Sequence, residues 1–351
     1  MTGPPAPAAN PDLFGHAAAE RAWLTAWRAG RLPHAWLLAG PRGVGKATLA
    51  YRLARAYLAG LSKEPAWNDP AAPVFRMVKS GGHPDLVVLE PATGKGKGGL
   101  WKVGDVRGAL EGLYRTSTTG RRICLIDEAD AVLNDEGENA LLKVLEEPPP
   151  GLVFLLVAQR PGRLLRTIHS RCAALHLAPL PESLVEEGLR RLVPDRDPAG
   201  LRHLAELGQG SIGRALEMEA LDWAGGYAAL LDAFAAARDE AGRLRAITTT
   251  MRQAEGAGSF RTVSTFLAVL LRRLVRVRLG RRPALELYPG EAERLERLAG
   301  TGDLDRWLAL WEKLAALAER VEAINLDPLQ AVLQIAHGIC SPEAERVPGF
   351  A

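Results

Sequence analysis

Residues 40–48 combine three glycines and a lysine within a short span, in the order Gly-Pro-Arg-Gly-Val-Gly-Lys-Ala-Thr. An apolar run at 35–39 precedes this segment, and a helical pattern of apolar residues at 46–59 follows it. Glycines in such a loop let backbone N–H groups face phosphate oxygens, and the helix N-terminus adds a favourable dipole. The candidate phosphate-binding residues are Gly40, Arg42, Gly43, Gly45, Lys46, Ala47 and Thr48.

The residue after the lysine departs from the usual phosphate-binding loop. That position normally carries Ser or Thr, whose hydroxyl ligates Mg²⁺, but this chain has Ala47 there. Thr48 follows one position later, where its side chain is turned by about 100° around the helix. We therefore expect ATP and Mg²⁺ to bind weakly or not at all, and hydrolysis by this chain to be inefficient.

Two carboxylates follow the apolar run at 123–126. Asp127 would position Mg²⁺ if a nucleotide binds, and Glu128 would act catalytically by polarising the attacking water. An acidic pair after a strand is weak evidence in isolation, because helix N-termini also favour acids. Beside a phosphate-binding loop in the same sheet, the pair indicates a nucleotide site.

Other stretches resemble the clamp-loader branch of the AAA+ ATPases. They are Asn-Ala-Leu-Leu-Lys-Val-Leu-Glu-Glu-Pro-Pro at 139–149, Phe-Leu-Leu at 154–156 and Thr-Ile-His-Ser-Arg-Cys at 167–172. The finer resemblance is to the delta-prime family of bacterial DNA polymerase III clamp loaders, carried by 32–41, 83–86 and 208–216. It is strong from about 32 to 216 and loose beyond.

The resemblance implies roles for two arginines. Arg171 would be an arginine finger that acts in trans on the nucleotide of an adjacent subunit, although an arginine in a turn is often only a solvated charge. Arg214 would sense the nucleotide of its own subunit, with a helix cap or an inter-domain salt bridge as the alternative. Gln159 falls near a position where active loaders carry a small hydroxyl residue.

The resemblance also implies partners and an activity. We expect a pentameric ring with gamma/tau-like and delta-like subunits that loads a sliding clamp onto primed DNA, while polymerase activity belongs to the holoenzyme. The alternative is a self-sufficient AAA+ ATPase acting in DNA repair or helicase loading, which Asp127 and Glu128 favour. A small-molecule kinase is disfavoured, because 139–149 and 170–172 would then be unexplained.

Continuous apolar runs at 35–39, 86–89, 123–126 and 153–157 alternate with helical patterns, which predicts an α/β fold with a parallel sheet covered on both faces. Helical patterns dominate from 179 onward. With the family architecture, this gives three expected domains: an AAA+ P-loop domain at 1–178, a small helical lid at 179–222 and an all-α collar for oligomerisation at 223–351. A Gly- and Lys-rich stretch at 93–99 is expected to be a mobile loop.

Composition narrows the function classes. The 351 residues are 47% hydrophobic and 24% charged, and a net charge of +3 does not suit a protein that coats nucleic acid by itself. The three cysteines form no C-x-x-C pair, and 60–85 holds none of the four zinc-binding cysteines that many relatives carry, so we expect no zinc. No apolar run approaches the roughly 18 residues of a membrane span, so we expect a cytoplasmic protein with no membrane contact.

The last third of the chain contains an acid-free basic helix pattern at 270–282, with arginines at 272, 273, 276, 278, 281 and 282. A solvated outer face is the default interpretation, and contact with an acidic partner or a DNA phosphate track is the sharper alternative. Trp307 and Trp311 are spaced i, i+4 and are expected in the core of the last domain.

Overall fold

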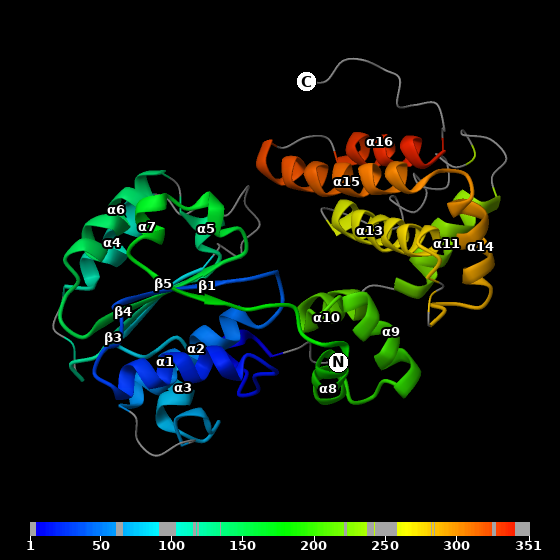
Figure 1. Ribbon diagram of the computed structural model, residues 1–351. Coiled ribbons are helices and arrows are strands. Elements are labelled where there is room, and N and C mark those ends of the chain that lie inside the picture. Colours follow the sequence, from blue (N-terminus) through cyan, green and yellow to red (C-terminus); the bar gives the residue numbers. More distant parts are fainter. Residues whose placement is uncertain are drawn as a thin grey trace. The chain divides into compact units, whose positions relative to one another are not determined.

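The computed structural model describes residues 5–60, 66–90, 103–114, 117, 119–133, 135–220, 223–236, 242, 258–281, 283, 285–324 and 328–340. The chain divides into two compact units, Met1–Leu216 and Glu217–Ala351 (Figure 1). The finer separation of a lid at 179–222 stays a prediction. The loop expected at 93–99, and Arg282 of the basic pattern, lie outside the described residues.

The first unit is built on a parallel sheet in the order β2-β3-β4-β1-β5. Its strands are β1 (Ala35–Ala39), β2 (Leu86–Leu89), β3 (Arg122–Ile126), β4 (Leu152–Ala158) and β5 (Ala173–His176). The central strands β1, β3 and β4 are buried along their whole length, which confirms the α/β class predicted from continuous apolar runs. No apolar run predicts β5, because this short edge strand buries only Leu175.

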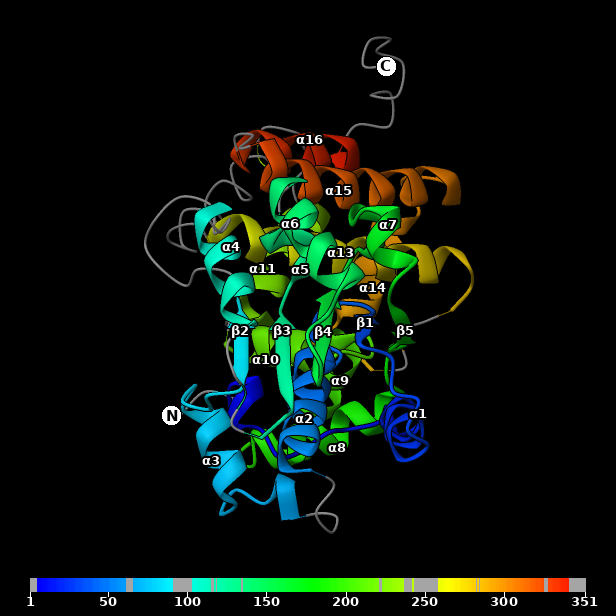
Figure 2. The same ribbon diagram turned by 90° about the vertical axis from the view of Figure 1, so that its left-hand side faces the viewer.

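Helices cover both faces of this sheet (Figures 1 and 2). On one face lie α1 (Ala17–Arg28), α2 (Lys46–Ala59) and α3 (Pro73–Lys79), with the short 3-10 turns η1 (Pro7–Ala9) and η2 (Ala66–Asn68) packed against α2. On the other lie α4 (Val103–Gly112), α5 (Ala129–Val132), α6 (Asp135–Glu146) and α7 (Arg166–His169), the last preceded by η3 (Pro161–Arg163). Alternate residues of strands β1 to β4 therefore enter different cores.

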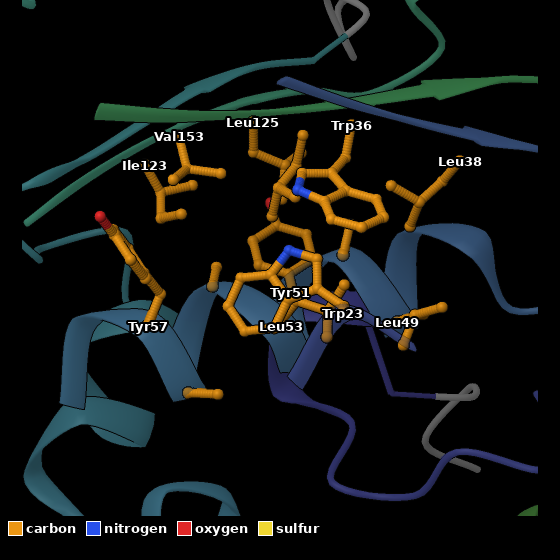
Figure 3. Packing of buried hydrophobic residues seen from close by; sticks show 14 of the residues in the cluster. Trp23, Trp36, Leu38, Leu49, Tyr51, Leu53, Tyr57, Ile123, Leu125 and Val153 are labelled. Atoms are coloured by element: carbon orange, nitrogen blue, oxygen red, sulfur yellow. The ribbon is translucent and has the colours of Figure 1, made fainter. Parts of the chain in front are cut away.

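Aromatic side chains fill the core between the sheet and the helices α1 and α2 (Figure 3). Trp23 is fully buried, and its ring makes edge contacts with Trp27 and Tyr57 at centroid distances of 5.3 and 6.2 Å. Trp36 and Leu38 of β1 face this cluster, while Leu37 faces the opposite core. The packing fixes β1 and α2, and with them the loop at 40–45 that joins the two elements.

Three helices, α8 (Glu182–Leu192), α9 (Pro198–Gly208) and α10 (Ile212–Ala220), follow β5. Asp197 caps α9 by accepting the Gly200 N–H, and Gln209 ends that helix in the left-handed conformation with φ 52°. The resulting turn through Gly210 directs the start of α10 at the loop 40–45. Residues at the start of α10 thus bond to residues of the loop 40–45 within the first unit.

The second unit is helical, with α13 (Gly258–Arg278) packed against α11 (Trp223–Ala236), α14 (Glu291–Ala299), α15 (Leu304–Ile324) and α16 (Pro328–Cys340). The solvated face expected for the basic pattern is wrong at Arg273. That side chain is 1% exposed and pairs with the fully buried Glu291, Nη1 to Oε2 at 2.9 Å. Arg273 therefore links α13 to α14 through a buried ion pair.

The two tryptophans of α15 have different environments. Trp307 is fully buried as expected, but the expectation for Trp311 is wrong, because 45% of this residue is exposed. The buried stripe of α15 runs through Trp307, Leu310, Leu314 and Leu317, and Trp311 lies beside it. Among the residues that the structure describes, no helix has the length and apolar character needed to cross a membrane.

Candidate functional site

The loop between β1 and α2 has the backbone of a phosphate-binding loop. Gly43 and Gly45 have φ values of 74° and 106°, which side-chain-bearing residues rarely adopt. Gly45 is the N-cap of α2, so the helix starts at Lys46 as the sequence predicts. A Cβ atom at Gly43 would lie 2.5 Å from Ser211 Oγ, so a close approach also requires glycine there.

Lys46 is turned inward onto its own loop. Its Nζ donates to the carbonyl oxygens of Gly40 at 2.8 Å and Pro41 at 2.7 Å, and the residue is only 5% exposed. Burial lowers the pKa of Lys46 to about 8, although Asp127 opposes this shift. To reach a phosphate, the ammonium group would have to exchange these two carbonyl bonds for the new ones.

The carboxylates that follow β3, Asp127 and Glu128, both accept hydrogen bonds from neighbouring groups. Burial raises the pKa of Asp127 to about 6, and its Oδ1 accepts the Glu128 backbone N–H at 2.9 Å. Glu128 has a left-handed backbone, φ 49°, and its Oε1 accepts from Gln159 Nε2 at 3.2 Å. Gln159 thus holds the carboxylate that sequence analysis assigned to the attacking water.

Asp130 is a site residue to which sequence analysis gave no role. Its carboxylate oxygens accept the backbone N–H groups of Gln159 at 3.1 Å and Arg160 at 2.7 Å. These bonds tie the end of β4 to the first turn of α5. The only sequence signal was its place three residues after Asp127, in the acidic run that follows β3.

A cavity of about 300 Å³ gathers most of the predicted nucleotide-site residues. Arg42, Gly43, Gly45, Lys46, Ala47, Thr48, Asp127 and Glu128 all line it, and Gln159 does too. Gly40, Arg171 and Arg214 are not among its lining residues. Leu13, Phe14 and Ile212 add an apolar wall that sequence analysis did not identify, because these residues come from segments without a nucleotide motif.

The loop residues that line the cavity can bind a phosphate chain, and Asp127 and Glu128 are the carboxylates that could hold a magnesium ion beside it. Loop N–H groups and a buried lysine match phosphate oxygens, whereas Ala47 brings no oxygen to the site. Thr48 also lines the cavity, so a hydroxyl is present one position away from the usual one. Among the described residues, no group of three or more His, Cys, Asp and Glu is arranged to hold a metal ion.

The start of α10 contacts the phosphate loop directly. Ser211 Oγ donates to the Arg42 carbonyl at 2.8 Å, and the Gly213 N–H donates to the Gly43 carbonyl at 2.9 Å. Arg214 donates from its backbone to Ser211 Oγ at 3.1 Å and from Nη1 to Gln209 Oε1 at 3.2 Å. Both of these Arg214 bonds are to residues within five positions of it in the chain, and its role as a nucleotide sensor, a helix cap or an inter-domain salt bridge stays a prediction.

Arg171 lies two residues after α7, away from the cavity wall. Its side chain is 34% exposed, and Nη2 donates to Glu146 Oε1 at 2.7 Å. Nη1 donates to the Thr167 carbonyl oxygen at 3.0 Å. The guanidinium therefore lies partly exposed, bonded to Glu146 and Thr167, and is not part of the cavity lining.

Comparison with known proteins finds a matching family and several similar DNA polymerase III subunits, with the family match in the first half of the chain. Residues 15–181 match the family described as DNA polymerase III, delta subunit. The chain is 36% identical to DNA polymerase III subunit delta' of Pseudomonas aeruginosa over 181 residues, which are 51% of this chain and 53% of the relative. It is also 36% identical to subunit delta' of Escherichia coli over 197 residues, 56% of this chain and 57% of that relative.

A second kind of relative is DNA polymerase III subunit tau of Escherichia coli. It is 33% identical over 221 residues, which are 60% of this chain and 33% of the relative. The chain thus spans about half the length of the delta' relatives it matches.

Proposed function

We propose that this chain, whose residues 15–181 match the family described as DNA polymerase III, delta subunit, is a delta-prime subunit and works in a clamp loader. In that assembly, gamma/tau-like and delta-like subunits complete a pentameric ring in the bacterial cytoplasm. The ring uses ATP to load a sliding clamp onto primed DNA. This chain contributes structural support and Arg171, whose charge stabilises the transition state at a neighbouring subunit.

The observation that carries the proposal is the separation of Arg171 from the chain's own cavity. The cavity has Ala47 where a magnesium-binding hydroxyl is expected, and Lys46 is bonded to its own loop. Arg171, in contrast, is presented on the surface. This arrangement favours a subunit whose chemistry is directed at the nucleotide of a neighbour.

The proposed step is electrostatic. A planar guanidinium that reaches the γ-phosphate of an adjacent ATP stabilises the charge that develops during phosphoryl transfer, and such fingers are worth about 10³-fold or more in rate. Magnesium and the attacking water would belong to the neighbour's site. This chain would supply the donor N–H groups of Arg171 and hold them in place.

The test replaces Arg171 in the reconstituted complex and measures ATP hydrolysis stimulated by clamp and DNA. Arg171→Ala should slow hydrolysis at one interface while assembly, followed by size-exclusion chromatography, stays intact. Arg171→Lys should rescue poorly, because an ammonium keeps the charge but loses the planar fork. Loss of assembly in Arg171→Ala, or full activity at saturating ATP, would return Arg171 to a structural role.

The alternative function is a self-sufficient AAA+ ATPase acting in DNA repair or helicase loading. It is favoured by the presence of Lys46, Asp127 and Glu128 around one cavity of about 300 Å³. ATP turnover by the purified chain separates the two proposals. The clamp-loader proposal expects negligible turnover, whereas robust Mg²⁺-dependent turnover that Lys46→Ala abolishes would establish the alternative.

A further inference from the structure

Glu146, the last residue of α6, contacts the side chain proposed as the finger. Arg171 Nη2 donates to Glu146 Oε1 at 2.7 Å, although the residues are 25 positions apart. α6 packs against α7 on one face of the sheet, and this packing brings the two residues together (Figures 1 and 2). The sequence gives no signal for the pair.

The rest of the Arg171 side chain and its backbone are also fixed. Nη1 donates to the Thr167 carbonyl oxygen at 3.0 Å and approaches Ser170 Oγ at 3.5 Å. The Arg171 N–H donates to the carbonyl of Ile168, a fully buried residue. A guanidinium has five N–H bonds, so the three contacts made within the described part of the chain leave two for a ligand.

The ion pair between Arg171 and Glu146 contributes little to the folding stability of the chain. The two side chains are 34% and 55% exposed, and ion pairs this open to solvent contribute little to stability. The pair does restrict a long, flexible side chain before any neighbour arrives. Ordering a catalytic group in advance lowers the entropy lost when it reaches the transition state.

We propose that Glu146 is the positioning residue of the finger, holding the Arg171 guanidinium so that its two remaining N–H bonds face the nucleotide of the adjacent subunit. This inference rests on the proposed function of Arg171. Glu146 acts only through Arg171 and touches no nucleotide itself. Its removal should therefore affect turnover more than the concentration of ATP needed to saturate the complex.

The experiment measures kcat and KM for ATP hydrolysis by the reconstituted complex carrying Glu146→Gln. The control is Glu147→Gln, which makes the same change of charge one residue away, at an exposed position. Glu146→Gln should lower kcat about threefold with little change in KM, a smaller loss than that of Arg171→Ala. Glu147→Gln should match the wild type.

A double variant separates an action through Arg171 from an independent one. Glu146→Gln combined with Arg171→Ala should be no slower than Arg171→Ala alone, because the positioned group is already absent. A slower double variant would overturn the inference. If Glu146→Gln hinders assembly, Glu146→Asp, which retains the charge on a shorter side chain, takes its place and is expected to lower kcat by less.

The outcomes distinguish this inference from the proposed function. Full activity in Arg171→Ala overturns both. Reduced activity in Arg171→Ala together with unchanged activity in Glu146→Gln overturns the positioning role alone. A faster Glu146→Gln complex would also overturn it, because Glu146 would then restrain the finger.

Discussion

The buried Asp127 carboxylate lowers the stability of the folded chain at neutral pH. Burial raises the pKa of its carboxyl to about 6, so at neutral pH the folded chain holds a charge in an environment that favours the neutral form. Burial also disfavours the charged form of Lys46, because it lowers the pKa of the ammonium group to about 8. Shifts of both signs in one cavity are typical of functional sites.

Asp127→Asn should therefore stabilise the chain by about 1–2 kcal/mol at pH 7.5, because it removes a buried charge and keeps an acceptor for the Glu128 N–H. The gain should shrink as pH falls from about 6 towards 4, where the native Asp127 is protonated while the unfolded one is still ionised. Urea unfolding at several pH values measures this, with the exposed Asp195→Asn as control. Equal effects of the two substitutions would contradict the assignment.

At this scale the sequence identified motif residues and missed their partners. Lys46, Asp127 and Glu128 follow from local patterns, and the cavity brings them together. The pairing of Glu146 with Arg171 and the bonds of Asp130 to the end of β4 depend on the packing of segments far apart in sequence. No local pattern records such contacts.

At the scale of elements, the contact between α10 and the phosphate loop depends on two glycines. A Cβ atom at Gly213 would lie 2.7 Å from the Gly43 Cα, and the atoms it meets are all backbone. The contact is also hydrogen-bonded through the Gly43 carbonyl. The loop that would bind phosphate is thus held in place by α10, which lies about 170 residues later in the chain.

Gly213→Ala should destabilise the full chain by about 1–3 kcal/mol, because neither backbone can move away without losing that hydrogen bond. Gly162→Ala is the control, since a Cβ atom there meets nothing within 4 Å and the backbone needs no positive φ. Thermal unfolding of both variants, followed by circular dichroism, provides the comparison. A Gly213→Ala chain as stable as Gly162→Ala would show that α10 is not packed on the loop.

The second unit depends on a buried polar network that joins three helices. Glu291 of α14 accepts from Tyr227 of α11 at 2.8 Å and pairs with Arg273 of α13. Its other oxygen accepts the Leu287 N–H. Burial and the nearby Glu291 carboxylate raise the pKa of Tyr227, so its hydroxyl stays protonated as a donor.

Arg273→Met should cost about 3 kcal/mol of stability, because it leaves the Glu291 carboxylate buried without its counter-charge. Adding Glu291→Gln should recover part of that loss. Urea unfolding tests both variants, and Arg278→Met, at an exposed position of the same helix, should change stability by less than about 0.5 kcal/mol. Indistinguishable results for Arg273→Met and Arg278→Met would contradict a structural role for this network.

The sequence predicted the main elements and missed those without strong local signals. Strands β1 to β4 were expected because continuous apolar runs are typical of strands buried on both faces. β5 was missed because an edge strand needs only a single buried side chain, and α3 was missed because its seven residues bury only Phe75 and Val78. Arg273 was misassigned because an arginine buried by a distant glutamate looks the same in sequence as a solvated one.

At the scale of the molecule, the chain joins an α/β unit, Met1–Leu216, to a helical unit, Glu217–Ala351. The family match covers only the first of these, so the role of the second in holding a ring together is a proposal. The central claim is that the chemistry of this chain serves a neighbouring nucleotide through Arg171, and its own phosphate loop is dispensable.

The rate at which the reconstituted complex loads the clamp onto primed DNA tests this claim most directly, with Lys46→Ala and Arg171→Ala compared in otherwise identical assemblies. We predict that Lys46→Ala loads at nearly the wild-type rate, while Arg171→Ala assembles normally and loads more slowly. The opposite pattern, a slow Lys46→Ala complex and an unaffected Arg171→Ala complex, would contradict the account.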